Sequence, residues 1–153
     1  MIRQFVPGEV CLKCKGCCRF SEEDNIWLPV LLDSESHLAS GAKKVKTIPR
    51  QGEGFICSFL SSEDNKCKIY PSRPFECQLY PLLINRKGKE LFLAVDLNCP
   101  FAARHIGHPQ FQAYQDYLKS FLAAPGQTEI IRNPRQFQSY EGVRDLFRIE
   151  IKL

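Results

Sequence analysis

Eight cysteines are the residues with the clearest chemistry in this chain of 153 residues. Three of them, Cys11, Cys14 and Cys17, follow a C-x2-C-x2-C spacing, and Cys18 comes directly after the third. Two intervening residues allow one tight loop to direct successive thiolates at a single centre, as in zinc sites and iron–sulfur clusters. The spacing therefore predicts a metal centre with Cys11, Cys14 and Cys17 as ligands, and it leaves the fourth ligand open.

The adjacent pair Cys17 and Cys18 poses a geometric problem for a single metal ion. Neighbouring side chains of an extended chain point to opposite sides, so one tetrahedral ion is hard to serve with both. We therefore expect the two thiolates to serve different centres, or one of them not to be a ligand; a vicinal disulfide would be strained. The other four cysteines bring the total to eight, the number that two four-thiolate sites need: Cys57, Cys67, Cys77 and Cys99.

The number of cysteines also bears on the cellular compartment. Eight in 153 residues is a lower fraction than the roughly 8–10% of short secreted disulfide scaffolds. The first ten residues lack the apolar stretch of a signal peptide, which predicts a cytoplasmic protein. Thiols stay reduced in the cytosol, so clustered cysteines there indicate metal binding or redox chemistry.

The charge balance does not single out a nucleic acid or a membrane as partner. The 21 basic and 17 acidic residues give a net charge of +4, but eight thiolates around two dipositive cores would bring it to zero. The basic stretches 43–50 and 86–89 contain no aromatic residues for base stacking, which favours solvated loops. The longest apolar run, 26–32, is far shorter than the roughly 20 residues of a membrane-spanning helix.

The combined cysteine pattern resembles a known family. After C-x2-C-x2-C-C the chain has Cys57 and Cys67, then Ile69-Tyr70 followed by Arg73-Pro74 and Cys77, and finally Cys99-Pro100. This is similar to the YkgJ-type CxxCxxCC family, a zinc- or iron-chelating domain, over residues 11–100. The cluster is also similar to that of the flagellin lysine N-methylases, which are associated with an iron–sulfur centre. The resemblance implies metal binding by all eight cysteines: Cys11, Cys14, Cys17, Cys18, Cys57, Cys67, Cys77 and Cys99.

Three functions remain open at this point. The close spacing of the cysteines and the late Cys-Pro favour one or two [4Fe–4S] clusters, for electron transfer or as the metallocentre of a partner or modification system. The alternative is a zinc-stapled protein-interaction module without a redox role. A methylase-like enzyme that uses S-adenosylmethionine is the third, although the chain has no Walker A, G-x-G-x-x-G or C-x3-C-x2-C motif. The first two functions imply a protein partner.

Other candidate residues have a simpler interpretation. We expect His105 and His108 to flank the start of a helix at the surface rather than to ligate a metal, and His37 to be a surface residue. Arg73 either offsets thiolate charge or holds the turn from Tyr70 to Pro74. Three aromatic side chains are expected to shield the metal site from water: Trp27, Tyr70 and Tyr80.

The elements that position these residues can be read from the periodicity. Residues 11–20 are expected to form a compact loop, 26–28 and 54–60 short strands, and 42–54 a loop. A short helix is predicted from Asp33 to a stop at Gly41. The units Cys67–Pro71 and Cys77–Pro81 share the order Cys, polar, aliphatic, Tyr, Pro, which suggests two similar loops that deliver thiolates.

The second half of the chain has stronger periodicity. Residues 82–84 and 91–95 predict an antiparallel hairpin with Gly88 in its turn, and an apolar stripe predicts a helix over 109–124. Alternation over 147–153 predicts a terminal strand. We therefore predict one small α+β domain over 1–153, with cysteine-rich metal-bound loops, an antiparallel hairpin and one long C-terminal helix.

Overall fold

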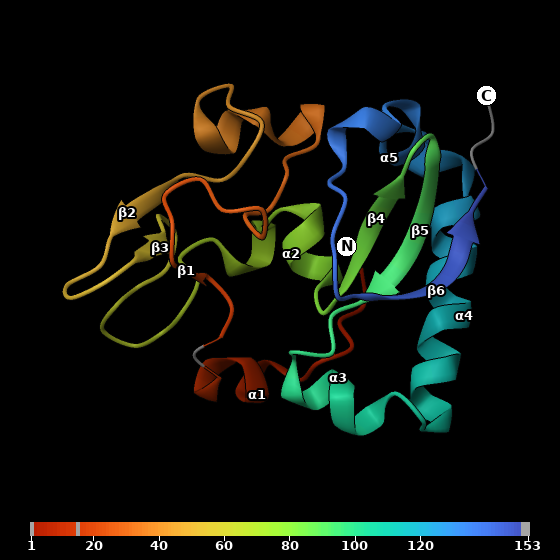
Figure 1. The fold of residues 1–153 in the computed structure, drawn as a ribbon, viewed down its shortest axis with the longest axis horizontal. Helices are drawn as coiled ribbons and strands as arrows, with labels where there is room; N and C mark the ends of the chain where they lie inside the picture. The colour runs from red at the N-terminus through yellow and green to blue at the C-terminus, as the bar shows by residue number, and fades with distance from the viewer. Residues whose placement is uncertain (1, 15, 151–153) are drawn as a thin grey trace. The chain divides into compact units, whose positions relative to one another are not determined.

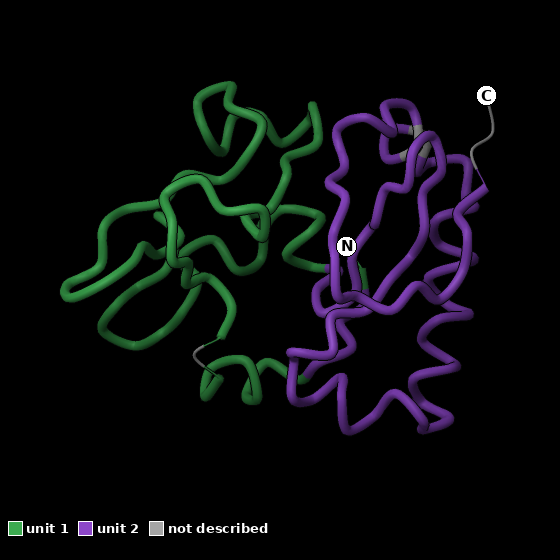
Figure 2. Tube along the Cα trace, in the orientation of Figure 1, with its two compact units in different colours: residues 1–2, 7–78 green, residues 3–6, 79–153 purple. Residues whose placement is uncertain are grey.

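The computed structural model describes residues 2–14 and 16–150, with the side chains of all of these except Thr128 and Ile131. The chain divides into two compact units, unit 1 with residues 1–2 and 7–78 and unit 2 with residues 3–6 and 79–153 (Figure 2). The order of the elements, labelled in Figure 1, is α1 (Gly8–Lys13), β1 (Arg19–Phe20), η1 (Asp33–Ala39), β2 (Thr47–Pro49), β3 (Phe55–Cys57), η2 (Tyr70–Ser72), α2 (Phe75–Leu79), β4 (Leu82–Lys87), β5 (Glu90–Val95), α3 (Pro100–His105), α4 (Pro109–Ala123), η3 (Pro125–Gln127), α5 (Thr128–Arg132), η4 (Pro134–Gln136) and β6 (Arg144–Ile149). That the whole chain forms one domain stays a prediction.

Unit 1 contains a small antiparallel sheet with the strand order β1-β3-β2. Ile56 in the central strand is opposite Arg19 on one side and Ile48 on the other. The strand predicted over 54–60 is thus confirmed in its first half, over 55–57, whereas the segment 42–54 is only partly a loop because it contains β2. Basic residues flank β2 and its side chains are largely exposed, so the sequence of this segment lacks the apolar alternation that predicts a strand.

Local hydrogen bonds determine the conformation of two further segments of unit 1. The strand predicted over 26–28 is wrong, because Asn25 Oδ1 accepts the Trp27 N–H at 3.0 Å and closes a turn. The helix predicted from Asp33 is confirmed as the 3-10 helix η1. It ends where Ser40 and Gly41 both have positive φ, and the Gly41 N–H donates to the Ser36 carbonyl at 2.9 Å.

Unit 2 contains a regular antiparallel sheet with the strand order β4-β5-β6 (Figure 1). The predicted hairpin is confirmed, with Leu82 opposite Val95 and with Gly88 at φ 61° in the turn. The buried Asn85 links this sheet to the returning chain. Its Nδ2 donates to Asp145 Oδ1 at 3.1 Å, and its Oδ1 accepts the Tyr140 N–H at 2.8 Å.

The long helix α4 supplies one face of the core of unit 2. Its residues Phe111, Tyr114, Leu118 and Leu122 are buried at steps of three and four, as the apolar stripe predicts. The helix is not C-terminal, however, because short helices and then β6 follow it. The predicted terminal strand is confirmed up to Ile149, and its last residues, 151–153, lie outside the described residues.

The architecture is therefore α+β, with two antiparallel three-stranded sheets and several helices. In the described part of the chain, none of the helices combines the length and the apolar character that crossing a bilayer requires.

Candidate metal centre

Four cysteines of unit 1 lie close enough for their charges to act on one another. Cys18 is influenced by Cys57 and Cys67, and Cys77 is influenced by Cys18, Cys57 and Cys67. All four are at least partly withdrawn from solvent. We call these four residues the inner thiol group: Cys18, Cys57, Cys67 and Cys77.

The environment of Cys18, Cys57 and Cys77 opposes the ionisation of their thiols. Burial, followed by the charges of Cys57 and Cys67, raises the pKa of Cys18 to about 12, and Arg19 acts in the opposite direction. Burial is also the main reason why the pKa of Cys77 lies well above its ordinary value. Thiolates here need a compensating cation, and a bound divalent metal supplies one because it deprotonates its thiol ligands.

The central strand of unit 1 positions two members of the inner thiol group. Cys57 ends β3 opposite Thr47 of β2, and its N–H donates to the Cys18 carbonyl at 2.9 Å. Burial raises the pKa of Cys57, while hydrogen bonds with the backbones of Phe59 and Leu60 counteract part of this rise. A backbone hydrogen bond thus joins the two residues that carry these thiols.

The other two members come from elements of different kinds. Cys67 pairs with Leu60 in an isolated antiparallel bridge, whereas Cys77 lies within the short helix α2. The Tyr-Pro steps that follow also differ, since Tyr70 begins the 3-10 helix η2 and the Tyr80–Pro81 peptide is cis. The prediction of two similar loops is therefore wrong, although both segments do bring a thiol to the same group.

Cys11, Cys14 and Cys17, here called the outer cysteines, occupy a more exposed segment. Cys11 lies on α1 and Cys14 ends that helix, so the expected compact loop is replaced by a short helix over its first residues. Cys11 and Cys17 are exposed, and the charge of Cys11 contributes to the raised pKa of Cys18. The structure thus places Cys11 near the inner thiol group.

The expected divergence of Cys17 and Cys18 has a different cause from the one predicted. Cys18 has φ 65°, so the pair is not in an extended conformation. Cys17 remains exposed, while the thiol of Cys18 is largely buried. None of the eight cysteines is joined in a disulfide, the vicinal pair included.

Cys99 belongs to unit 2, unlike the other seven cysteines. It is the N-cap residue of α3, immediately before Pro100, and its N–H donates to the Asp96 carbonyl at 3.3 Å. Asp96 in turn accepts a hydrogen bond from Tyr80 Oη at 2.8 Å. The role of Cys99 as a ligand stays a prediction.

The residue types of the inner thiol group fit a metal, although the side chains are not arranged at the spacing of metal ligands. Over residues 2–14 and 16–150, no three His, Cys, Asp or Glu side chains are already arranged to hold an ion. The inner thiol group nevertheless offers four sulfur donors, and four thiolates are the ligand set of structural zinc sites and of iron–sulfur clusters. The chemistry of the donors therefore fits zinc or iron equally.

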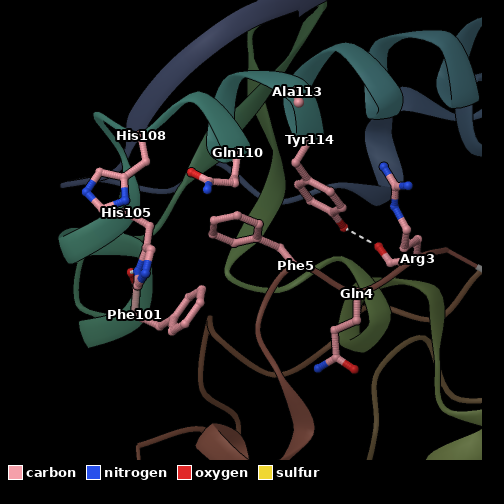
Figure 3. A pocket seen from close by; sticks show the side chains of 9 residues that line it. All are labelled: Arg3, Gln4, Phe5, Phe101, His105, His108, Gln110, Ala113 and Tyr114. Carbon is pink, nitrogen blue, oxygen red and sulfur yellow. Dashed lines mark hydrogen bonds between the residues drawn. The ribbon is translucent and has the colours of Figure 1, made fainter.

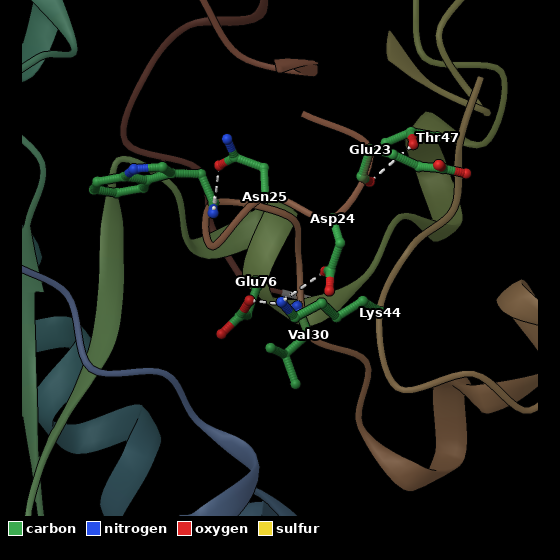
Figure 4. A network of polar contacts seen from close by, with 8 residues as sticks. Glu23, Asp24, Asn25, Val30, Lys44, Thr47 and Glu76 are labelled. Carbon is green, nitrogen blue, oxygen red and sulfur yellow. Dashed lines mark hydrogen bonds and ion pairs between the residues drawn. The ribbon is translucent and has the colours of Figure 1, made fainter. Parts of the chain in front are cut away.

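A carboxylate that sequence reasoning missed lies beside Cys77. Glu76 Oε2 accepts the Val30 N–H at 2.7 Å, and its Oε1 is buried with no hydrogen-bond partner (Figure 4). Burial raises the pKa of Glu76 to about 7; the charge of Glu35 adds to this effect, and the Val30 hydrogen bond and Lys44 oppose it. The only signal in the sequence is an acidic residue between Phe75 and Cys77, which is too common to identify such a group.

Arg73 and Tyr70 act together within unit 1. Arg73 is buried; its Nη1 donates to the Tyr70 carbonyl at 3.0 Å, and its guanidinium lies 3.9 Å from the centre of the Tyr70 ring. The structure thus supports the interpretation that Arg73 holds the turn. Tyr70 is 40% exposed, so it shields little of the site directly.

The two neighbouring histidines belong to a separate feature of unit 2. His105 is half-buried at the end of α3, where its Nδ1 lies 2.7 Å from the Phe101 carbonyl, and His108 is the N-cap residue of α4. Both line a cavity of about 500 Å³ together with Phe5 and Tyr114 (Figure 3). They flank the start of a helix as expected, and His37 is exposed as expected.

Comparison with known proteins identifies one family. The model of the CxxCxxCC family, described as "Putative zinc- or iron-chelating domain", matches residues 10–100. The match includes all eight cysteines and extends from unit 1 into unit 2. Searches of curated proteins and of solved structures found no significant match.

Proposed function

Because the chain belongs to the CxxCxxCC family of zinc- or iron-chelating domains, we propose that the inner thiol group is its metal centre. The observation that supports this proposal most directly is that burial, and then the charges of Cys18, Cys57 and Cys67, raise the pKa of the Cys77 thiol, so these four residues lie close together. Without a cation such a cluster favours neutral thiols. With a bound metal, the same burial stabilises the metal–thiolate bonds, because it keeps competing water away from them.

We propose an iron–sulfur centre, of the [4Fe–4S] type, as the native form. The C-x2-C-x2-C spacing of the outer cysteines supports this choice, since it is the spacing of bacterial ferredoxins. The outer cysteines and Cys99 bring the number of cysteines in the chain to eight, the number of thiolates that two four-thiolate clusters use. In this form the cluster carries electrons to or from a protein partner in the cytoplasm, and the surrounding protein sets its potential.

A structural zinc ion is the second candidate, and the shortness of the strands in unit 1 favours it. These strands contain only two or three residues each, so their ladders supply few hydrogen bonds. A tetrahedral zinc ion held by the inner thiol group would join β3, α2 and the segments around Cys18 and Cys67. The protein would then be an interaction module without redox chemistry.

A count of iron, zinc and acid-labile sulfide on the anaerobically purified chain tests these proposals. A brown protein with about four irons and four sulfides per cluster supports the iron–sulfur form, and a colourless protein with stoichiometric zinc supports the structural ion. Anaerobic, reduced protein that folds normally and contains neither metal refutes both.

Two substitutions locate the centre within the chain. Cys77→Ser removes a donor of the inner thiol group, and we expect it to abolish metal loading at that group. Cys17→Ser, an exposed cysteine of the same chain, is the matched control and should leave the inner centre loaded. The reverse result would place the main centre in the outer cysteines.

A further inference from the structure

Asn65 connects two cysteine-bearing segments of unit 1 that are far apart in the sequence. Its Nδ2 donates to the Leu12 carbonyl at 2.7 Å and to the Cys14 carbonyl at 3.5 Å. Its Oδ1 accepts a hydrogen bond from Arg19 Nη2 at 2.8 Å. One amide thus contacts the chain within the C-x2-C-x2-C motif and just beyond Cys18, and it stands two residues before Cys67.

The backbone around Asn65 presents this amide in a fixed direction. Asn65 has φ 58°, a left-handed conformation that asparagine tolerates better than most residues. Its N–H donates to the Ser61 carbonyl at 3.0 Å, and the Ser61 N–H donates to the Lys66 carbonyl at 2.8 Å. Glycine would also suit this backbone, but it has no side chain with which to reach Leu12 and Arg19.

The helix that Asn65 contacts is too short to hold itself in place. Helix α1 has six residues, and the carbonyls of its last turn have no partners within the helix. Isolated helices of this length are unstable in water, so its order depends on tertiary contacts. The hydrogen bond from Asn65 to the Leu12 carbonyl satisfies one of these carbonyls and attaches the end of α1 to the turn before Cys67.

We propose that Asn65 is a positioning residue that holds the outer cysteines beside the inner thiol group before any metal binds. A segment that is already ordered loses less conformational entropy when its thiolates become ligands, so the affinity for the metal rises. This inference rests on the proposed metal-binding function. It adds a residue that donates no ligand atom and acts only through the backbone of the motif.

The substitution Asn65→Asp tests the proposal with little change in shape. Aspartate keeps an Oδ1 that can accept from Arg19, but it replaces the amide donor with an oxygen that faces two carbonyls. Asn25→Asp is the matched control: it adds the same charge in unit 1, and Asn25 serves as an acceptor for the Trp27 N–H, which a carboxylate can also be.

The first measurement uses reduced, metal-free protein and needs no metal. Trypsin cleavage after the exposed Lys13, followed by mass spectrometry, reports how firmly the segment is held. We expect cleavage to be about tenfold faster in Asn65→Asp, since the loss of these hydrogen bonds raises the population of the detached segment, and unchanged in Asn25→Asp. Unchanged cleavage in a folded Asn65→Asp protein would overturn the proposal.

The second measurement is the affinity for Zn²⁺, determined in competition with a chromophoric chelator. We expect about tenfold weaker binding for Asn65→Asp and wild-type binding for the control. Faster cleavage with unchanged affinity would make Asn65 a purely structural residue and would overturn its link to the metal. If the wild-type chain binds no metal, the proposed function fails, and the cleavage rates still show whether Asn65 holds the segment. Should Asn65→Asp not fold, Asn65→Gly removes the amide while keeping the left-handed backbone, with the same expected results.

Discussion

Units 1 and 2 are of similar length, but their structures are stabilised by different means. In unit 2 the three strands have six residues each and pair along their length, with one register shift between β5 and β6, and their apolar side chains are largely buried. In unit 1 the strands have two or three residues. Among the described residues, all non-glycine residues with positive φ fall in unit 1: Cys18, Ser40 and Asn65. Regular hydrogen-bond ladders thus suffice for one unit and not for the other.

Unit 1 compensates with hydrogen bonds from side chains to backbone. Two carboxylates replace ladder partners, because Glu35 accepts the N–H groups of Leu32 and Phe75, and Glu76 accepts the N–H of Val30. Such bonds stabilise single points rather than whole strands, at about 1 kcal/mol each or somewhat more when the acceptor is charged. A unit built in this way therefore gains the most from ligand bonds to a metal.

Removal of the metal should have the largest effect, and it should be confined to unit 1. We expect the amides of β3 to exchange with deuterium about a thousandfold faster after chelation, if the metal had been present at a thousand times its Kd. The amides of β5 should keep their protection, because a complete apolar core surrounds them. Hydrogen exchange with and without chelator measures both; an equal increase in the two strands would contradict the comparison.

A substitution that leaves a cavity in the core of unit 2 should destabilise unit 2 and leave the metal centre in unit 1 intact. Leu93 is fully buried in β5, and Leu93→Ala should lower the free energy of unfolding by about 3 kcal/mol, from lost apolar contact and the cavity left behind. Thermal or denaturant unfolding checks the size of the effect. The metal content of the folded protein should not change, and a loss of metal would show that the centre depends on the core of unit 2.

The buried carboxyl of Glu76 should make the metal-free protein less stable as the pH rises. Its folded-state pKa of about 7 exceeds its ordinary value of 4.5, so its contribution to stability is full below pH 4.5 and is lost as the pH rises through about 7. The change is at most about 3 kcal/mol, from 1.36 kcal/mol for each pKa unit. Glu76→Gln should remove this part of the pH dependence in denaturant unfolding at pH 5 and pH 8. An unchanged profile would show that Glu76 is ionised without cost in the folded state.

The smallest expected effect on stability comes from a change in the backbone of unit 1. A Cβ at Gly54, which has φ 83°, would lie 2.6 Å from the Phe20 carbonyl oxygen, so Gly54→Ala combines a strained φ with a clash between backbone segments. Gly52 also has positive φ, at 98°, but no atom lies within 4 Å of its Cβ position. We expect Gly54→Ala to cost about 2 kcal/mol and Gly52→Ala about 1 kcal/mol in unfolding free energy. Equal costs would mean that β1 and β3 separate easily.

The same contrast explains which elements could be predicted from the sequence. The hairpin of β4 and β5 and the helix α4 follow from apolar periodicity, which acts over many residues and is robust to local detail. The turn at Asn25 and the strand β2 could not be predicted, because a single side-chain hydrogen bond decides the first and pairing with β3 decides the second. Periodicity carries no information on either.

The candidate site shows a similar limit. The eight cysteines are evident from their spacing, and their family is confirmed by the match over residues 10–100. The grouping is not evident, since the inner thiol group takes one member, Cys18, from the N-terminal motif and three from later segments. Glu76 and Asn65 carry no sequence signal of their own, because their roles arise from contacts with Val30 and Leu12 that only the folded chain creates.

The buried Asn85 has a consequence for the register of the last strand of unit 2. Its amide has one partner on β6 and another on the approaching chain, Asp145 and Tyr140. If the last strand were displaced by one residue, the Asn85 amide would lose these hydrogen bonds while it remained buried among apolar residues. The strand β6 would also turn its opposite face inward. A slipped form would therefore be less stable than the native pairing, so Asn85 favours the correct register of β6.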